Sequence, residues 1–286
     1  MKLGVIGAKL GHTASPAIHD KLFRILQVQD KSRYGVLEMD RNDIPNELNR
    51  LRHEGYTGAN VTIPYKLDVM PYLTDISREA RIIGAVNTIH FTDHGTFGYN
   101  TDYCGFGRSL AHAGISVKDK DCVVLGSGGG ARAIIQYLFD YGAKSIVVVS
   151  RRPHSKTDFE AFTKRIGVET IDYHTFEQNC RGDILVNCTP VGMFPNIDGC
   201  PISEAAVARF PAVVDIVYNP KDTCILQAAK RHGAKTLNGM YMLVAQAIGS
   251  EEIWMNQEIA STVIEQIAKE MEHYYENKQN IIIIGM

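Results

Sequence analysis

The chain has 286 residues, of which 45% are hydrophobic and 22% are charged, which indicates a globular protein of one large domain or two ordinary domains. Its formal net charge of −2 gives no electrostatic footprint for nucleic acid or for an acidic membrane surface, so neither partner is expected. No apolar run is long enough to span a bilayer and the first residues do not form a signal peptide, so we predict a cytoplasmic protein.

The N-terminal segment predicts a buried strand over residues 2–7, a loop, and a helix over residues 17–26. Pro16 suits the first turn of that helix. Thr13 and Ser15 therefore lie at or just before a helix N-terminus, where hydroxyls and free amides can bind a carboxylate. Ordinary capping of the helix by Ser15 is the alternative.

Strands are next predicted at residues 34–39 and 59–63, with an amphipathic helix over residues 44–53 between them. This alternation predicts a mostly parallel sheet with helices on its faces.

Lys66 follows Pro64, which ends the strand at 59–63 because proline cannot donate a hydrogen bond to a sheet. The next residues, 67–73, have helix-like apolar spacing, which would place Lys66 at a helix N-terminus. The dipole there favours a neutral amine over an ammonium, which suits a lysine that exchanges a proton. A surface lysine after a turn is the alternative.

A β-hairpin is predicted after this segment, with its first arm over 84–90 and its turn at 93–95. The second arm ends in the run 98–102. Asn87 and Asp102 thus lie at strand ends, where open sheets place their ligands.

The second half begins with an apolar strand over 121–125, a glycine turn over 126–131 and a helix over 132–141. Strand, G-x-G-x-x-A turn and helix together form the context of a dinucleotide-binding fingerprint, in which a pyrophosphate lies at the helix N-terminus. The predicted cofactor residues of the turn are Gly126, Ser127, Gly128, Gly129, Gly130 and Ala131.

The next strand, over 145–149, ends in Ser150, Arg151 and Arg152. A site for NAD would place an acidic residue here to hold the ribose hydroxyl, whereas cations suit the 2′-phosphate of NADP. We therefore predict NADP as the cofactor, with Lys156 as a further candidate. An exposed basic turn is the alternative.

Four motifs, taken together, resemble the shikimate dehydrogenase family, and the likeness extends over nearly the whole chain. They are His12-Thr13-Ala14-Ser15-Pro16, Asn60-Val61-Thr62-x-Pro64-x-Lys66, Gly84-Ala85-Val86-Asn87-Thr88 and Gly98-x-Asn100-Thr101-Asp102. The chain has Thr13 where the family usually has serine, which keeps the hydroxyl and adds a methyl group. Arg152 likewise replaces a more usual small hydroxyl residue.

The resemblance implies an α/β fold with an N-terminal, mostly parallel substrate-binding catalytic domain over 1–103. A Rossmann-type NADP-binding domain over 104–238 would follow, and C-terminal helices over 239–278 would return to the first domain. It also implies reduction of 3-dehydroshikimate to shikimate with NADPH, by a monomer or homodimer. Lys66 and Asp102 would be the catalytic pair that handles the proton.

The resemblance further implies which side chains hold substrate and cofactor. The substrate residues would be Thr13, Ser15, Asn60, Thr62, Asn87, Tyr218 and Gln246. Beyond the glycine turn and the segment 150–152, the cofactor residues would be Thr189, Ile216, Gly239 and Met242. The strands that lead to several of them are predicted at 184–188 and 213–217, and a long helix is predicted at 257–276. A structural role in the core is the alternative for Tyr218.

The six cysteines form no Cys-x-x-Cys pair, and they lie at positions 104, 122, 180, 188, 200 and 224. This spacing favours neither a zinc site nor a disulfide framework. We predict no metal and interpret the cysteines as reduced structural thiols.

The end of the chain, residues 279–286, contains four isoleucines followed by Gly285. This run resembles a buried strand that enters a phosphate loop, as at the start of a shikimate kinase. We therefore predict that the tail begins a truncated following domain. A native terminal strand or a ragged tail is the alternative.

Other functions fit parts of the sequence. A quinate/shikimate dehydrogenase that uses NAD or both cofactors is the nearest alternative, although Arg151 and Arg152 favour NADP. A methylene-tetrahydrofolate dehydrogenase shares the two-domain plan, but the Thr13/Ser15 loop and the motif at 98–102 argue against it. A non-catalytic NADP sensor is disfavoured because every polar position that the chemistry needs is filled.

Overall fold

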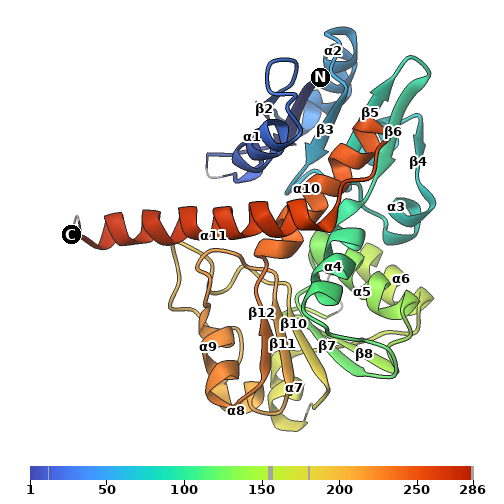
Figure 1. The fold of residues 1–286 in the computed structure, drawn as a ribbon. Coiled ribbons are helices and arrows are strands. Elements are labelled where there is room, and N and C mark those ends of the chain that lie inside the picture. The colour runs from blue at the N-terminus through green and yellow to red at the C-terminus, as the bar shows by residue number, and fades with distance from the viewer. Residues whose placement is uncertain (12, 154–156, 180, 285–286) are drawn as a thin grey trace. The chain divides into compact units, whose positions relative to one another are not determined.

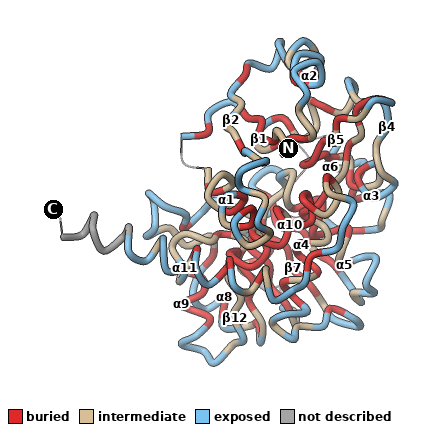
Figure 2. Tube along the Cα trace, turned by 45° about the horizontal axis from the view of Figure 1, so that its top comes forward, coloured by how far each residue is buried: buried red, intermediate tan, exposed pale blue. Residues whose placement is uncertain are grey.

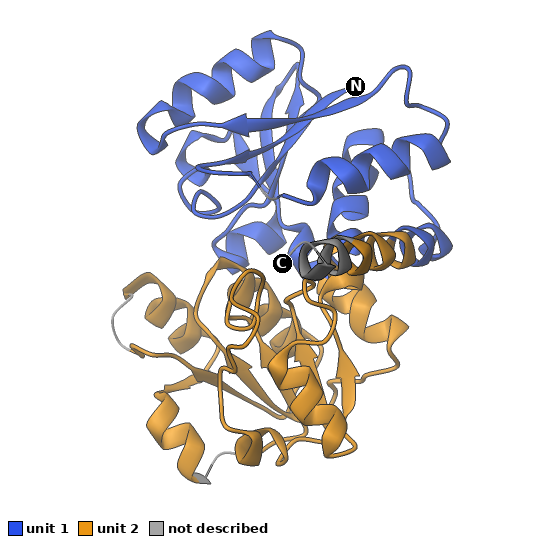
Figure 3. Ribbon diagram, turned by 90° about the vertical axis from the view of Figure 1, so that its left-hand side faces the viewer, with its two compact units in different colours: residues 1–105, 244–267 blue, residues 106–243, 268–286 orange. Residues whose placement is uncertain are grey.

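The computed structural model of the chain describes residues 1–11, 13–153, 157–179 and 181–284 (Figure 1). His12 of the first motif, the cofactor candidate Lys156, Cys180 and Gly285 lie outside the described residues. The chain divides into two compact units, residues 1–105 with 244–267 and residues 106–243 with 268–286 (Figure 3). Each unit contains one six-stranded sheet, which confirms the predicted α/β class.

The sheet of the first unit has the strand order β2-β1-β3-β5-β6-β4. Its strands are β1 (Lys2–Gly7), β2 (Arg33–Glu38), β3 (Gly58–Val61), β4 (Asp75–Ile76), β5 (Thr88–Thr92) and β6 (Gly95–Tyr99). The strand β1 pairs in parallel with β2 and β3, as the alternation of strands and helices predicted. The strands β5 and β6 form the predicted hairpin and pair antiparallel. The strand β5 also pairs antiparallel with β3, so the sheet as a whole is mixed.

The helices of the first unit are α1 (Ser15–Ile25), α2 (Ile44–His53), α3 (Arg78–Ile83) and two 3-10 helices, η1 (Arg41–Asp43) and η2 (Met70–Tyr72). Three further helices carry the chain between the units: α4 (Thr101–His112), α10 (Met240–Met255) and α11 (Ser261–Ile284). None of the helices in the described part of the chain is both long and apolar enough to cross a bilayer.

The helix predicted over residues 67–73 is wrong. Residues 63–69 form successive turns that lead into η2, so Lys66 does not lie at the N-terminus of an α-helix. The carbonyl of Lys66 accepts a hydrogen bond from the amide of Val86 at 2.7 Å, and Pro71 has no amide hydrogen to continue a helix. The argument from the helix dipole therefore does not apply to Lys66.

The sheet of the second unit is parallel throughout, with the order β12-β11-β10-β7-β8-β9. Its strands are β7 (Asp121–Leu125), β8 (Ser145–Val149), β9 (Glu169–Ile171), β10 (Ile184–Asn187), β11 (Ala212–Asp215) and β12 (Lys235–Leu237). Its own helices are α5 (Gly129–Asp140), α6 (Thr157–Arg165), α7 (Tyr173–Asn179), α8 (Glu204–Val207) and α9 (Cys224–Arg231). The strand order reverses between β7 and β10, which is the Rossmann arrangement, with its ligand crevice at the carboxyl ends of these strands.

Two apolar clusters form the core of the second unit, and Figure 2 shows that the segment labelled β7 is buried. Alternate residues of β7 enter different apolar clusters: Cys122 and Val124 join one, and Val123 and Leu125 join the other. A strand buried on both faces needs apolar side chains in both directions, which explains its continuous apolar run.

The predicted strand over residues 281–284 is also wrong, because these residues continue α11 to Ile284. A helix satisfies its backbone hydrogen bonds within one segment, whereas a strand needs a neighbouring strand. The run of isoleucines alone therefore does not make this segment a strand.

Candidate active site

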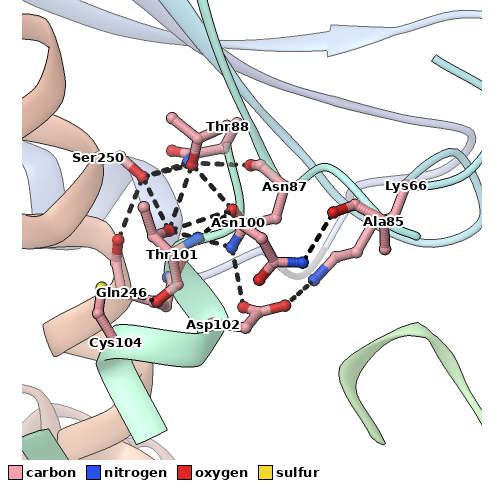
Figure 4. A network of polar contacts seen from close by, with 11 residues as sticks. Lys66, Ala85, Asn87, Thr88, Asn100, Thr101, Asp102, Cys104, Gln246 and Ser250 are labelled. Atoms are coloured by element: carbon pink, nitrogen blue, oxygen red, sulfur yellow. Dashed lines mark hydrogen bonds and ion pairs between the residues drawn. The ribbon is translucent and has the colours of Figure 1, made fainter. Parts of the chain in front are cut away.

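Lys66 and Asp102 form an ion pair in the first unit, with 2.6 Å between Lys66 Nζ and Asp102 Oδ2 (Figure 4). Their side chains are only 15% and 9% exposed, so the pair is largely shielded from solvent but keeps some accessible surface. Asp102 lies in the first turn of α4, where a negative charge is favoured. The turns after β3 supply the lysine, so this pair joins segments that are 36 residues apart in the sequence.

Asn87 fixes the carboxylate of Asp102 from the other side. Its Nδ2 donates to Asp102 Oδ1 at 2.9 Å, and its Oδ1 accepts the backbone N–H of Thr101 at 2.7 Å. The side chain of Asn87 is buried. Asn87 therefore joins the start of β5 to the start of α4, and both oxygens of Asp102 have a donor.

A buried hydroxyl network lies beside this pair (Figure 4). Ser250 on α10 bonds to Thr88 at 2.8 Å and to Thr101 at 3.2 Å, and its hydroxyl contacts the carbonyl of Gln246 at 3.1 Å. Sequence reasoning missed Ser250. The available signal was its spacing, because residues four apart on a helix share a face and Gln246 was already a candidate.

Asn60, at the end of β3, belongs to the same network. Its Nδ2 donates to Ser250 Oγ at 2.8 Å, and its Oδ1 accepts from the hydroxyl of Tyr34 at 2.7 Å. Both ends of the amide are thus bound to protein groups. Asn60 fixes the end of β3. The half-buried Thr62 follows this strand, and the turns that carry Lys66 come next in the chain.

Thr13 and Ser15 lie beside each other at the start of α1. Thr13 Oγ1 donates to Ser15 Oγ at 3.3 Å, and Ser15 is the first residue of the helix rather than its cap. Ala14 occupies the capping position and makes no side-chain cap hydrogen bond, whereas Thr13 Oγ1 accepts the backbone N–H of Ser15 at 3.4 Å. Ordinary capping by Ser15, the alternative drawn from the sequence, is therefore not observed.

Gln246 lies on α10 against Gly105 of α4. A Cβ at residue 105 would come within 2.9 Å of Gln246 Cβ, so the close approach of the two helices requires glycine there. The first unit contains Lys66 together with most of the other candidates: Thr13, Ser15, Asn60, Thr62, Asn87, Asp102 and Gln246. Tyr218 belongs to the second unit, where its ring lies 5.5 Å from that of Tyr275 and burial raises the pKa of its hydroxyl.

The glycine turn of the second unit leads directly into α5. Gly126 has φ +103°, a conformation that favours glycine, and α5 begins at Gly129 with no side-chain cap. A Cβ at Gly128 would meet nothing within 4 Å. The first-turn amides of α5 are therefore open to an anion, and the segment fits the pyrophosphate of a dinucleotide.

Gly128→Ala tests this fit. The backbone of Gly128 is extended at φ −84°, so alanine should fold normally and shift the melting temperature by no more than about 2 °C. The methyl group would fill the space beside the pyrophosphate, and we expect KM for NADP to rise roughly tenfold. Thermal unfolding and steady-state kinetics measure the two effects. Gly35→Ala, on the first unit's sheet, is the control; an unchanged KM in Gly128→Ala would contradict the assignment.

The end of β8 lies beside the glycine turn. Ser150 Oγ is 3.3 Å from Ser127 Oγ and also accepts the backbone N–H of Arg152 at 3.3 Å. Ser150 is buried, whereas Arg151 and Arg152 are exposed. This edge therefore presents two cations next to the anion-binding turn, and the residues fit the 2′-phosphate of NADP.

A buried carboxylate, Asp215, joins the ends of β10 and β11. Its Oδ1 accepts from Asn187 Nδ2 at 2.9 Å and from the amide of Val217 at 3.0 Å, and its Oδ2 accepts from the hydroxyl of Thr223 at 2.7 Å. Burial raises the pKa of Asp215 to about 6, and these hydrogen bonds oppose the shift. Asn187 in turn accepts from Thr189 Oγ1 at 2.7 Å, so Asp215 orders the loop that carries Thr189.

Sequence reasoning missed Asp215 and Asn187. The available signal was a polar side chain at the end of an otherwise apolar strand, in each case at the carboxyl edge of the sheet.

Ile216 and Gly239 are in close contact. A Cβ at residue 239 would lie 2.0 Å from the carbonyl oxygen of Ile216, so only glycine fits, and a Cβ at Gly130 would lie 3.8 Å from Ile216 Cδ1. Ile216 therefore lies near both the glycine turn and the start of α10. Met242, in the first turn of α10, is buried in the apolar cluster of this unit.

Known proteins resemble this chain over most of its length. Residues 5–89 match the family model of the shikimate dehydrogenase substrate binding domain. The NADP(+) shikimate dehydrogenase of Clostridium beijerinckii is 42% identical over 253 residues, which cover 88% of this chain and 90% of that protein.

Solved structures also resemble the chain over most of its length. A chorismate mutase/shikimate 5-dehydrogenase fusion protein from Clostridium acetobutylicum superposes with a TM-score of 0.91 at 40% identity, covering 96% of this chain and 98% of that one. Shikimate 5-dehydrogenase from Thermus thermophilus in complex with NADP(H) and shikimate superposes with a TM-score of 0.83 at 29% identity, covering 94% and 99%.

Proposed function

The chain belongs to the shikimate dehydrogenase family, and we infer that it is an NADP-dependent oxidoreductase that reversibly reduces 3-dehydroshikimate to shikimate in aromatic amino-acid biosynthesis. The observation that carries the chemistry is the Lys66–Asp102 pair, with 2.6 Å between nitrogen and oxygen. Reduction of a ring ketone needs a proton donor at its oxygen, and a shielded ammonium held by a carboxylate supplies one.

We propose that Lys66 donates a proton to the developing alkoxide and that Asp102 orients the ammonium, with both side chains touching the reacting oxygen. NADPH, when bound, supplies the hydride. In the direction of shikimate oxidation the same lysine receives the proton, by microscopic reversibility. Asn87 supports this geometry because it holds Asp102 Oδ1 at 2.9 Å.

We propose that Thr13 and Ser15 bind the substrate carboxylate. Their adjacent, half-buried hydroxyls at the start of α1 support this role. The substrate hydroxyls are assigned to Thr62, Asn87 and Gln246. Asn60 and Tyr218 complete the proposed substrate set.

The proposed cofactor site lies along the carboxyl edge of the second unit's sheet. The open helix end after the glycine turn supports binding of the pyrophosphate, and the exposed arginines support binding of the 2′-phosphate. The nicotinamide is assigned to Ile216, Gly239 and Met242, and the turn at Thr189 is assigned to a position beside the cofactor. The domain limits proposed from the sequence, 1–103, 104–238 and 239–278, follow the same division of roles.

The test offers shikimate and quinate, each with NADP and with NAD, and records the absorbance of the reduced nicotinamide. Rapid reduction of NADP by shikimate alone is the expected result. Activity with quinate or NAD would favour the alternative, a quinate/shikimate dehydrogenase of broader specificity. The methyl group that Thr13 adds to the usual serine would then be a candidate cause of the altered substrate choice. Folded protein that binds NADP but reduces nothing would contradict the proposed reaction.

The proposal includes a cytoplasmic location and a monomer or homodimer. It also retains a second catalytic domain, such as a shikimate kinase, downstream of Met286. The sequence of the tail supports this second domain, as does the existence of a similar dehydrogenase that is fused to a chorismate mutase.

A further inference from the structure

His19 on α1 and Glu251 on α10 form a buried pair that the sequence did not reveal. His19 Nδ1 lies 2.6 Å from Glu251 Oε1, and both side chains are 0% exposed. Both belong to the first unit, in segments 232 residues apart. The proposed chemistry uses neither group.

Stability alone does not explain this pair. Within the part of the chain that the structure describes, His19 Nε2 and Glu251 Oε2 are buried and have no hydrogen-bond partner. Two of the four polar side-chain atoms of the pair thus make no hydrogen bond to a described residue. Such a buried pair stabilises a fold no better than apolar side chains of similar volume, and often less well.

The pair contacts the two groups that hold Asn60. The ring of His19 stacks on Tyr34 at 3.9 Å between centroids and an interplanar angle of 9°, and the hydroxyl of Tyr34 donates to Asn60 Oδ1 at 2.7 Å. Glu251 is adjacent in the chain to Ser250, whose hydroxyl accepts from Asn60 Nδ2 at 2.8 Å. Both ends of one amide thus depend on groups that the His19–Glu251 bond locks together.

The same bond joins the two helices that carry proposed substrate residues. His19 is one turn after Ser15 on α1, so the two side chains share a face of that helix. Glu251 lies on α10, which also carries Gln246. A hydrogen bond between His19 and Glu251 therefore sets the position of Ser15 relative to Gln246 and Asn60.

We propose that His19 and Glu251 are positioning residues for the substrate: their hydrogen bond aligns α1 and α10 so that the carboxylate-binding and hydroxyl-binding side chains have the correct spacing. This inference rests on the proposed function. Its expected signature is weaker substrate binding, with the chemistry and the cofactor site of the second unit unaffected.

Two substitutions of His19 separate the hydrogen bond from the ring. In asparagine the amide nitrogen takes the place of Nδ1 and can still donate to Glu251, whereas in glutamine it takes the place of Nε2 and cannot; both lose the stacked ring. We expect His19→Gln to raise KM for shikimate roughly tenfold, with kcat within about threefold of the unaltered enzyme and KM for NADP unchanged. His19→Asn should restore most of the substrate affinity. Equal KM values in the two variants would overturn the proposal.

A second pair of variants serves if either His19 variant fails to fold. Glu251→Gln keeps an acceptor for His19 and should bind shikimate normally, whereas Glu251→Met, similar in volume, should reproduce the rise in KM. Leu48→Ala, a core substitution of the same unit, controls for lost stability and should leave KM unchanged. Turnover of shikimate by the unaltered enzyme tests the proposed function separately, and indistinguishable Gln and Met variants would contradict the inference alone.

Discussion

Lys66→Ala is expected to lower kcat for shikimate oxidation by about 10²–10⁴-fold, the usual contribution of a positioned general acid or base. This loss corresponds to about 3–5 kcal/mol in the activation free energy. The reason is the removal of the group that exchanges a proton with the reacting oxygen, while Asp102 remains buried without its cation partner. Steady-state kinetics measures kcat, and calorimetric titration with NADP measures cofactor binding, which should be retained because the glycine turn belongs to the other unit.

The matched control is Lys120→Ala. Lys120 also pairs with an aspartate, Asp183 at 3.6 Å, but its side chain is 46% exposed and it lies in the second unit. This variant should keep normal turnover. If Lys66→Ala kept turnover within a few-fold of the unaltered enzyme, Lys66 would lose its proposed role even though the ion pair exists.

The double variant Arg151→Ser, Arg152→Ser is expected to raise KM for NADP by roughly 30-fold, because in the proposed site each exposed guanidinium would contribute one charge-assisted bond to the 2′-phosphate. KM for NAD, which has no 2′-phosphate, should change by less than about threefold. The preference of the variant for NADP over NAD should therefore fall by roughly the same factor. Steady-state kinetics with each cofactor, at one fixed ionic strength, measures the ratio.

Arg231→Ser provides the control for a general loss of positive charge. Arg231 lies in the same unit, has a 54% exposed side chain and pairs with Glu204. Its removal should leave both KM values unchanged. An equal rise of KM for NADP and NAD in the double variant would mean that the arginines do not discriminate by the 2′-phosphate.

The sequence by itself determined the elements whose signals are local. The strand β7, the glycine turn and α5 are specified by a contiguous run, since an apolar strand, a positive φ at Gly126 and an open helix end each need only neighbouring residues. The alternation of strands and helices likewise predicted the α/β class. The resemblance of four short motifs then identified Lys66 and Asp102 as candidates before their contact was known.

Only the tertiary structure decided how distant segments meet. The helix predicted over 67–73 fails because the amide of Val86 binds the carbonyl of Lys66, a partner that no local pattern shows. Asn60 and Ser250 are 190 residues apart, and His19 and Glu251 are 232 apart. A buried serine, histidine or glutamate has no periodic signal of its own, because its position depends on the partner that satisfies it. Hydrophobic spacing and turn residues are properties of a segment, whereas the hydrogen bonds that shape this site are properties of the folded chain.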